Sequence, residues 1–288
     1  MTGAGMTAGG WRCSPGWPSA ASPVVGVIGD PVAHSLSPRL HQAAFDALGL
    51  DWVSVAFAVA DRKTVAALDA VRALGLRGLS VTMPHKTAAA AAVDECTPAA
   101  ARLGAVNCIT RRGERLVGDS TDGPGFVQAL RRQIGFDPAG RTCAVLGAGG
   151  AARAVVLALA DAGAARVVVV NRSRQRAGQA AALAGATGTV GSSDEIAGAD
   201  LVVNATPLGM AGTASTAIPV EPGRLSPGQV VADLVYAPAI TPLLAAAAER
   251  GATTVGGLGM LVHQAALALQ QWTGQEAPIE AMWAAVTE

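Results

Sequence analysis

The sequence has no excess of charge of either sign, and charged residues are scarce in it. Lys and Arg number 21, Asp and Glu number 21, and charged residues occupy 15% of the 288 positions. Without a net field, nothing favours nucleic acid or an anionic membrane as a partner, and a small neutral or anionic ligand fits better. Charges and glycines also interrupt the Ala-rich segments, so no apolar run is long enough to span a bilayer.

Cysteine and histidine are scarce as well. None of the four cysteines belongs to a C-x-x-C pair; they are Cys13, Cys96, Cys108 and Cys143. Two of them lie in apolar, strand-like runs, which favours free, buried thiols in a reducing cytoplasm over disulfides or metal binding. The histidines lack the spacing of metal ligands; they are His34, His41, His85 and His263. We therefore predict a cytoplasmic protein, and the sequence implies no metal.

Residues 1–23 differ in composition from the rest of the chain. They are rich in Gly, Ser, Ala and Pro and have almost no hydrophobic periodicity. A signal peptide would need a continuous apolar region and a basic start, and both are missing. We predict a disordered tail. Hydrophobic residues make up 51% of the whole sequence. This fraction is enough to build the cores of two domains of ordinary size.

From residue 24 onward, apolar runs alternate with helical patterns. The apolar runs predict strands at residues 24–29, 51–59, 78–82 and 104–110, with a hairpin turn at 111–115. Residues 61–74 have helical periodicity, with apolar side chains at Val65, Leu68, Val71 and Leu74. Another helix is expected to begin at Thr97 and Pro98, which have the order of an N-cap and a first-turn proline.

Two serines lie two residues apart after the first predicted strand. Ser35 and Ser37 precede a helix predicted to begin near Pro38, so both hydroxyls can point into a pocket at the helix N-terminus. A carboxylate would bind well there, because a helix N-terminus presents free N–H groups and a partial positive charge. Plain N-capping by Ser37, with Pro38 at the first helical position, explains the spacing equally well.

Three further polar residues lie next to predicted strands. Lys86 follows a proline-fixed turn that can hold its amine over a cleft, although a solvated surface lysine is the alternative. Asn107 lies inside an apolar run, and a buried Asn needs partners from the backbone or from a ligand. Asp122 precedes a helix predicted over residues 126–134, where helix capping alone would explain it.

A glycine-rich turn connects a predicted strand to a helix in the middle of the chain. Residues 143–146 form a short apolar run, and G-A-G-G, starting at Gly147, leads into an Ala-rich helix. With Ala152 in the third position, this is the G-x-G-x-x-A form of the dinucleotide fingerprint. Glycine lets a pyrophosphate approach the unpaired N–H groups of the helix. A second strand at 166–170 closes a unit of about 30 residues, the expected length.

The remainder of the chain also alternates between strands and helices. Strands are predicted near Thr189 and over residues 201–204, 230–234 and 253–255, and helices over 173–184 and 241–250. Such alternation is typical of a parallel, doubly wound sheet. Two last helices, over 258–273 and 278–286, could return to pack on the first domain. The predicted fold is therefore α/β with two domains.

The residues after the second strand of the nucleotide unit indicate which dinucleotide binds. An NAD-specific protein usually has an acidic residue there, to bond the ribose 2′-hydroxyl, whereas this chain has Asn171. Three guanidiniums follow, at Arg172, Arg174 and Arg176, and they could clamp a 2′-phosphate. A solvated basic helix start is less favourable, because cations oppose the helix dipole there unless an anion lies between them. We therefore predict NADP rather than NAD.

Together these motifs resemble the shikimate dehydrogenase family, from about Val24 to the C-terminus. The resemblance rests on G-D-P-V-A-H-S-L-S-P from Gly29, V-T-M-P-H-K from Val81, G-A-V-N from Gly104, S-T-D-G from Ser120, G-A-G-G-A from Gly147, N-R-S from Asn171, N-A-T-P-L-G-M from Asn204, Y-A-P-A-I-T-P-L from Tyr236 and G-L-G-M-L-V-H-Q from Gly257. The family commonly has Asn where this chain has Ser120.

The resemblance implies roles for individual residues. Ser35 and Ser37 would bind the substrate carboxylate, and Lys86 with Asp122 would be the catalytic pair. The side chains around the ring hydroxyls would be Thr82, Lys86, Asn107, Asp122, Tyr236 and Gln264. NADP would contact Gly147, Ala148, Gly149, Gly150, Ala151, Asn171, Arg172, Ser173, Arg176, Leu234 and Gly257.

The resemblance also implies a domain plan. A substrate-binding domain would cover residues 24–123, a Rossmann-type NADP domain 124–257, and the helices of 258–288 would pack back on the substrate domain. The expected assembly is a monomer or a homodimer.

The implied activity is the reversible NADPH-dependent reduction of 3-dehydroshikimate to shikimate, on the route to chorismate and the aromatic amino acids. A quinate or quinate/shikimate dehydrogenase is the nearest alternative. Quinate carries an additional hydroxyl beside the carboxylate, so the pocket of Ser35 and Ser37 would have to make room for it. A non-catalytic NADP-binding sensor is a further alternative, but it would need neither Lys86 nor Asp122.

Overall fold

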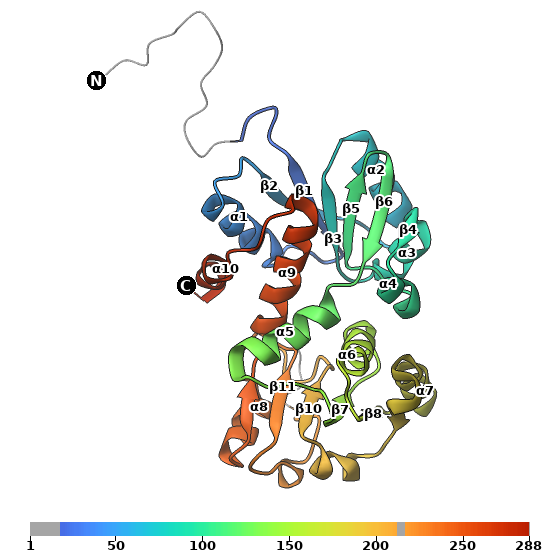
Figure 1. Ribbon diagram of the computed structural model, residues 1–288, viewed down its shortest axis with the longest axis vertical. Coiled ribbons are helices and arrows are strands. Elements are labelled where there is room, and N and C mark those ends of the chain that lie inside the picture. Colours follow the sequence, from blue (N-terminus) through green and yellow to red (C-terminus); the bar gives the residue numbers. More distant parts are fainter. Residues whose placement is uncertain (1–17, 212–216, 288) are drawn as a thin grey trace, which may run out of the picture.

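The strands of the protein form two six-stranded sheets in the part of the chain that the computed structural model describes, residues 18–211 and 217–287 (Figure 1). Each sheet is built from one half of the chain, and together they give the predicted two-domain α/β architecture. Most of the tail predicted over 1–23 lies outside the described residues. No helix within them is both long enough and apolar enough to cross a membrane.

The first sheet is mixed, with the strand order β2-β1-β3-β5-β6-β4. Its strands are β1 (Val24–Gly29), β2 (Val53–Ala58), β3 (Gly78–Val81), β4 (Glu95–Cys96), β5 (Cys108–Arg112) and β6 (Arg115–Asp119). The strands β2, β1 and β3 pair in parallel, and β5 joins β3 and β6 in antiparallel pairs. The predicted hairpin therefore connects β5 to β6.

Helices cover both faces of this sheet. Those that follow its strands are α1 (Ser37–Ala47), α2 (Thr64–Ala73), α3 (Lys86–Ala92) and α4 (Pro98–Leu103). The helices α2, α3 and α4 pack on one face, around Leu68, Leu79 and Ile109. On the other face α1 packs with the two C-terminal helices, α9 (Leu258–Thr273) and α10 (Ile279–Thr287). The last helices thus return to the first domain, as predicted.

The second sheet is parallel throughout, with the order β12-β11-β10-β7-β8-β9. Its strands are β7 (Thr142–Leu146), β8 (Arg166–Val170), β9 (Gly188–Val190), β10 (Leu201–Asn204), β11 (Val230–Asp233) and β12 (Thr253–Val255). Counted from β7, this is the 3-2-1-4-5-6 order of a Rossmann domain. The order reverses between β7 and β10, and ligands bind at such a switch point.

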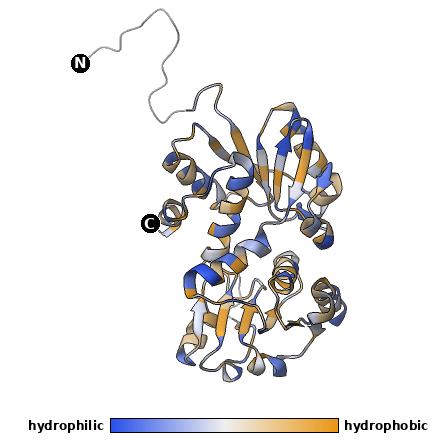
Figure 2. Ribbon diagram, in the orientation of Figure 1, coloured by the Kyte–Doolittle hydropathy of each residue, from blue (hydrophilic) through white to orange (hydrophobic). Residues whose placement is uncertain are grey.

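Alternating side chains of these strands enter two separate cores. Cys143 and Val145 pack toward α5 (Asp122–Ile134), α6 (Gly150–Asp161) and α7 (Arg174–Ala181). Ala144 and Leu146 face the opposite core, under α8 (Pro242–Glu249). Both faces are buried, which is why these strands are nearly continuous apolar runs. Figure 2 shows hydrophobic residues along the central strands of this sheet. Short 3₁₀ helices complete the domain at Ala182–Thr187, Ser193–Gly198 and Pro222–Arg224.

Two helices begin at different residues from those that the sequence predicted. The helix predicted from residue 61 begins at Thr64, which is buried, whereas Val65 and Leu74 are 58% and 71% exposed. The Thr64 hydroxyl pairs with a buried histidine, so the buried face is rotated relative to the prediction. The helix predicted from residue 126 begins at Asp122, four residues earlier. The domain boundary predicted between 123 and 124 therefore falls inside α5.

The strand predicted over 104–110 is also shifted, because β5 begins at Cys108 and ends at Arg112. Gly104, with φ +63°, ends α4, and the next residues turn toward the sheet before pairing begins. Of the described cysteines, Cys108 and Cys143 are buried free thiols and Cys96 is a partly exposed one. Cys13 lies outside the described residues.

Candidate active site

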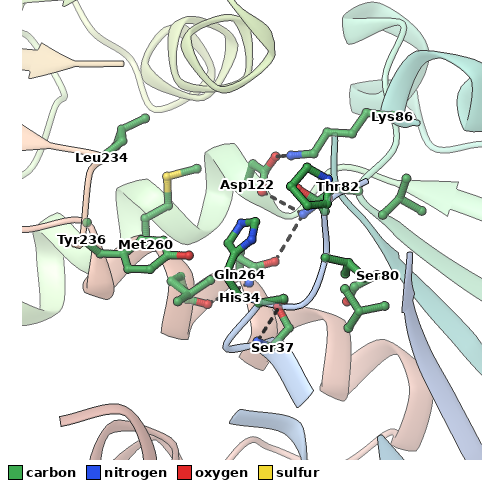
Figure 3. Close-up of a pocket in the computed structure, with 18 residues that line it drawn as sticks. His34, Ser37, Ser80, Thr82, Lys86, Asp122, Leu234, Tyr236, Met260 and Gln264 are labelled. Atoms are coloured by element: carbon green, nitrogen blue, oxygen red, sulfur yellow. Dashed lines mark hydrogen bonds and ion pairs between the residues drawn. The ribbon is translucent and has the colours of Figure 1, made fainter. Parts of the chain in front are cut away.

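A cavity of about 200 Å³ lies between the two domains, at the C-terminal ends of several strands (Figure 3). Both domains contribute to its lining. All eight residues predicted to contact the substrate lie there: Ser35, Ser37, Thr82, Lys86, Asn107, Asp122, Tyr236 and Gln264. Leu234 and Gly257, predicted for the cofactor, line the same cavity from the side of the second domain.

Lys86 and Asp122 form an ion pair at the wall of this cavity. The Lys86 Nζ atom lies 2.5 Å from Asp122 Oδ2, and the two side chains are 23% and 11% exposed. Each residue is the first of its helix, Lys86 of α3 and Asp122 of α5. A solvated surface lysine, the alternative left open by the sequence, is therefore wrong. Helix capping by Asp122 is wrong too, because the N-cap of α5 is Thr121.

Asn107 fixes the orientation of the Asp122 carboxylate. Its side chain is buried, and its Nδ2 atom donates to Asp122 Oδ1 at 2.8 Å and to Thr121 Oγ1 at 2.9 Å. The Thr121 N–H donates to Asn107 Oδ1 at 2.7 Å, which sets the orientation of the amide. Gln264 Oε1 lies a further 3.3 Å from Nδ2. The buried Asn thus finds protein partners, and these connect β5, α5 and α9.

The two serines lie at the start of α1, and neither caps the helix in the ordinary way. The N-cap is Leu36, which makes no side-chain cap, and Ser37 is the first helical residue. The N-capping role considered for Ser37 is therefore wrong. Ser35 Oγ accepts a hydrogen bond from the Ser37 N–H at 3.3 Å. With no acidic residue in the first turn of α1, this end of the cavity suits an anion.

His85, beside Lys86, has a structural task that the sequence did not reveal. Its ring is buried, with Nε2 2.8 Å from the Val59 carbonyl oxygen and Nδ1 2.9 Å from Thr64 Oγ1. A carbonyl only accepts, so Nε2 donates to the Val59 carbonyl oxygen, and Nδ1 pairs with the Thr64 hydroxyl. These two bonds attach the start of α3 to the residue that follows β2 and to the first residue of α2. No periodicity or spacing could have shown that His85 would meet these partners.

A buried carboxylate organises the loops on the far side of the cavity. Asp233, at the end of β11, accepts hydrogen bonds from Asn204 Nδ2 at 2.9 Å, from Thr241 Oγ1 at 2.7 Å and from the Val235 N–H at 3.0 Å. Burial raises the pKa of Asp233, and these hydrogen bonds oppose the rise. Burial likewise raises the pKa of the nearby Tyr236, whose phenol therefore stays protonated at neutral pH. Asp233 and its partners hold the loop that presents Leu234 and Tyr236.

Other lining residues escaped the sequence analysis. They include His34 and Ser80 of the first domain and Met260 and Leu261 of α9. Figure 3 shows the His34 ring near Gln264 and the Met260 side chain near Leu234. His34 belongs to the H-S-L-S-P motif and lies one residue before Ser35, which is the signal that could have identified it.

The glycine turn has the open geometry that a pyrophosphate requires. Gly147 has φ +113°, and a Cβ atom there would lie 2.9 Å from the Ala205 carbonyl oxygen. At Gly149 and Gly150 a Cβ atom would meet nothing within 4 Å, so the space in front of α6 is open. The helix begins at Gly150 with no side-chain cap and no acidic residue in its first turn. Its first N–H groups are therefore available to an anion.

Basic residues lie at the neighbouring strand end. Asn171 follows β8, and Ser173 caps α7 by accepting from the Arg176 N–H at 3.3 Å. The side chains of Arg172, Arg174 and Arg176 are exposed, and none forms an ion pair with a carboxylate in the described part of the chain. The residues present thus fit a dinucleotide with a phosphate on its ribose.

A Rossmann domain joined to a second α/β domain across a cavity with a lysine–aspartate pair is the arrangement of a two-domain, dinucleotide-dependent dehydrogenase. Three family models match the chain: the shikimate dehydrogenase substrate binding domain over residues 27–109, shikimate/quinate 5-dehydrogenase over 129–214, and the shikimate 5′-dehydrogenase C-terminal domain over 257–287. The chain belongs to the shikimate dehydrogenase family.

Individual relatives agree with this assignment. The shikimate dehydrogenase (NADP(+)) of Moorella thermoacetica is 46% identical over 91% of this chain and 92% of its own length. That of Symbiobacterium thermophilum is 48% identical over 90% and 92% of the two chains. The crystal structure of the Thermus thermophilus enzyme in complex with NADP(H) and shikimate is 38% identical, with a TM-score of 0.84 over 91% of this chain and 98% of that one.

Proposed function

We propose that the chain is an NADP-dependent shikimate dehydrogenase, which catalyses the reversible reduction of 3-dehydroshikimate to shikimate. The observation that carries this proposal is the Lys86–Asp122 pair, 2.5 Å apart, in a cavity between a two-serine helix start and the Rossmann domain. Family membership and the names of the relatives support the same activity. The reaction places the enzyme on the route to chorismate and the aromatic amino acids.

The chain supplies separate sites for the two ends of the substrate. The carboxylate binds to Ser35, Ser37 and the first N–H groups of α1. The first turn of this helix has no acidic residue that would repel it. Side chains with hydroxyl, amide or carboxylate groups surround the ring, so that they can pair with its hydroxyls: Thr82, Asn107, Asp122, Tyr236 and Gln264. These two sets fix the ring relative to Lys86, which reduces the entropy lost in reaching the transition state.

In this proposal Lys86 is the group that transfers the proton. During reduction the ketone oxygen develops negative charge, and the Lys86 ammonium stabilises that charge and donates a proton to the oxygen. In the reverse direction the Lys86 amine accepts the proton of the ring hydroxyl. Asp122 holds Nζ in place, and Asn107 in turn holds Asp122.

NADPH, when bound, supplies the hydride, and NADP⁺ accepts it in the reverse direction. The residues that fit this cofactor are those of the glycine turn, from Gly147 to Ala151, with Leu234 and Gly257 toward the cavity. Arg172 and Arg176 would hold the 2′-phosphate, with Asn171 and Ser173 beside them. A cytoplasmic location and a monomeric or homodimeric state stay predictions.

Steady-state oxidation of shikimate and of quinate, each with NADP and with NAD, tests the proposal. We expect a strong preference for shikimate with NADP. Comparable turnover of quinate or with NAD would leave the fold and the catalytic pair in place but assign the chain to the broader quinate/shikimate dehydrogenases. No turnover with any pair would contradict catalysis and favour an NADP-binding sensor.

A further inference from the structure

The helix behind the glycine turn also contacts the substrate domain. Leu103 and Ala105 of the first domain pack with Ala154 and Leu157 of α6 in a small buried cluster. The cluster lies where α4 approaches α6, on a part of the domain interface that does not line the cavity. The helix that follows the cofactor-binding turn is therefore in direct contact with the substrate domain.

Arg153 forms a side-chain hydrogen bond that spans this interface. Its backbone N–H donates to the Gly149 carbonyl oxygen at 3.0 Å, which is the ordinary i→i−4 bond of the first turn of α6. Its guanidinium Nη2 donates to the Leu103 carbonyl oxygen of the substrate domain at 2.7 Å. The Arg153 side chain thus connects the first turn of α6 to the substrate domain.

The segment that Arg153 holds leads directly to the active site. Leu103 is the last residue of α4, and Gly104 then turns the chain with φ +63°. Two residues later the Val106 N–H donates to the Lys86 carbonyl oxygen at 3.0 Å. The next residue, Asn107, orients Asp122. A displacement of the Leu103 carbonyl would therefore reach both members of the catalytic pair within a few residues.

The environment of Arg153 distinguishes it from an ordinary interdomain ion pair. Its Nε atom is buried and has no hydrogen-bond partner in the described residues, which costs stability. The neighbouring pair of Arg102 and Asp161 spans the same interface, but its side chains are 51% and 47% exposed, and such pairs contribute little. The Arg153 bond, by contrast, is partly buried and ends on a backbone carbonyl, so it holds the backbone of the substrate domain directly.

We propose that Arg153 is a positioning residue, which couples the cofactor-binding turn to the segment that carries Asn107 and holds Lys86. Occupation of the turn then orders the substrate site, and each ligand strengthens the binding of the other. The inference rests on the proposed function, because it takes NADP(H) and shikimate as the two ligands. It adds a residue that touches neither of them.

Titration with NADPH, with and without saturating shikimate, measures this coupling without turnover, because both ligands are reduced. In the wild type we expect shikimate to lower the Kd of NADPH about fivefold or more. In Arg153→Met we expect the ratio to fall below about twofold, while the Kd of NADPH alone changes less than about threefold. If the Met variant does not fold, Arg153→Lys is expected to lose coupling as well, because an ammonium lacks the reach and fork of a guanidinium.

Arg141→Met is the matched control. Arg141 lies in the same domain and pairs with Asp200 at 3.4 Å, away from the substrate domain, so its loss should leave the ratio unchanged. A wild-type ratio in Arg153→Met, or no coupling in the wild type, would overturn the inference. Neither result would touch the proposed function, which fails only if the wild type does not oxidise shikimate with NADP.

Discussion

The positive charge of Lys86 lies where the dipole of the helix backbone disfavours a cation. As the first residue of α3, it lies at the positive end of a helix, where cations are disfavoured. Asp122 lies at the start of α5, where an anion is favoured, and its carboxylate offsets the charge of Lys86 at 2.5 Å. The pair therefore brings a cation to the cavity that neither helix would hold alone.

Replacement of Lys86 tests its role as proton donor. In Lys86→Met we expect kcat for shikimate oxidation to fall about 10²- to 10⁴-fold, the range for loss of a general acid–base group. KM for shikimate should rise only a few-fold. Steady-state kinetics measures both values, and near-normal kcat with a loss of affinity alone would contradict the assignment. Lys63 is the only other lysine in the sequence and is exposed, so Lys63→Met is the matched control.

Ser37 offers a clean test of carboxylate binding. Its hydroxyl makes no hydrogen bond within the described residues, so Ser37→Ala leaves no buried protein group unpaired. We expect KM for shikimate to rise about tenfold or more, because a hydrogen bond to a charged group contributes about 1.5–3 kcal/mol. The melting temperature, kcat and KM for NADP should hardly change. An unchanged KM for shikimate would remove Ser37 from the site.

At the scale of single elements, much of the site is built from residues at the N-termini of helices. Ser37 opens α1, Lys86 opens α3, Asp122 opens α5 and Gly150 opens α6. In an α/β sheet the strands end where the following helices begin, so the topology collects these residues at one edge. That is why strand ends and helix starts pointed to Ser35, Ser37, Lys86, Asn107 and Asp122 in the sequence. The family resemblance was needed to add Thr82, Tyr236 and Gln264.

The start of α5 shows what the sequence could not reveal. Gly123, Pro124 and Gly125 looked like a break before the helix, yet they are its first turn. A Cβ atom at Gly123 would lie 2.5 Å from the Ala154 carbonyl oxygen, and one at Gly125 would lie 2.6 Å from the Gln264 backbone nitrogen. These glycines allow α5 to pack closely on α6 and α9. Such contacts join segments far apart in the chain and leave no local pattern.

The same limit applies to residues that act through others. The strands β1, β8 and β10 were predicted with their observed bounds, because short apolar runs between polar, proline or glycine residues mark them locally. No such local pattern identifies Thr121, His85 or Arg153. Each matters because of a partner from a distant segment: Asn107, Val59 and Leu103 respectively.

The residues at the start of α7 lead us to predict that the enzyme prefers NADP to NAD. Arg172 is exposed and forms no ion pair within the described residues, so Arg172→Ala should leave stability unchanged. We expect KM for NADP to rise about tenfold and KM for NAD to stay the same, because a hydrogen bond to a charged phosphate contributes about 1.5–3 kcal/mol. Arg166→Ala, at the opposite end of β8, is the control. Equal effects on both cofactors would contradict a 2′-phosphate contact.

For the whole molecule, a buried histidine makes stability depend on pH. His41 lies between α1, β2 and α9, with Nδ1 3.2 Å from Ser54 Oγ and Nε2 buried without a partner in the described residues. Burial lowers its pKa from 6.5 to about 3. Between these values the unfolded chain binds one more proton than the folded protein. The free energy of unfolding therefore falls as the pH falls below 6.5.

Chemical denaturation at several pH values measures this dependence. We expect the loss of stability between pH 6 and pH 4.5 to be smaller in His41→Gln than in the wild type, by about 1 kcal/mol per pH unit. The variant's stability at neutral pH does not enter the comparison, since only the two slopes are compared. Parallel slopes would show that His41 is protonated in the folded state.

The return of α9 and α10 to the first domain has a consequence for synthesis on the ribosome. Val25, Leu40 and Phe45 share one core with Leu269 and Met282, from the opposite end of the chain. The domain that is translated first is therefore the last to be completed, whereas the Rossmann sheet is continuous in sequence and can close before it. We expect a chain truncated after residue 257 to have α1 accessible to protease and the second sheet protected, an order that equal protection of both would refute.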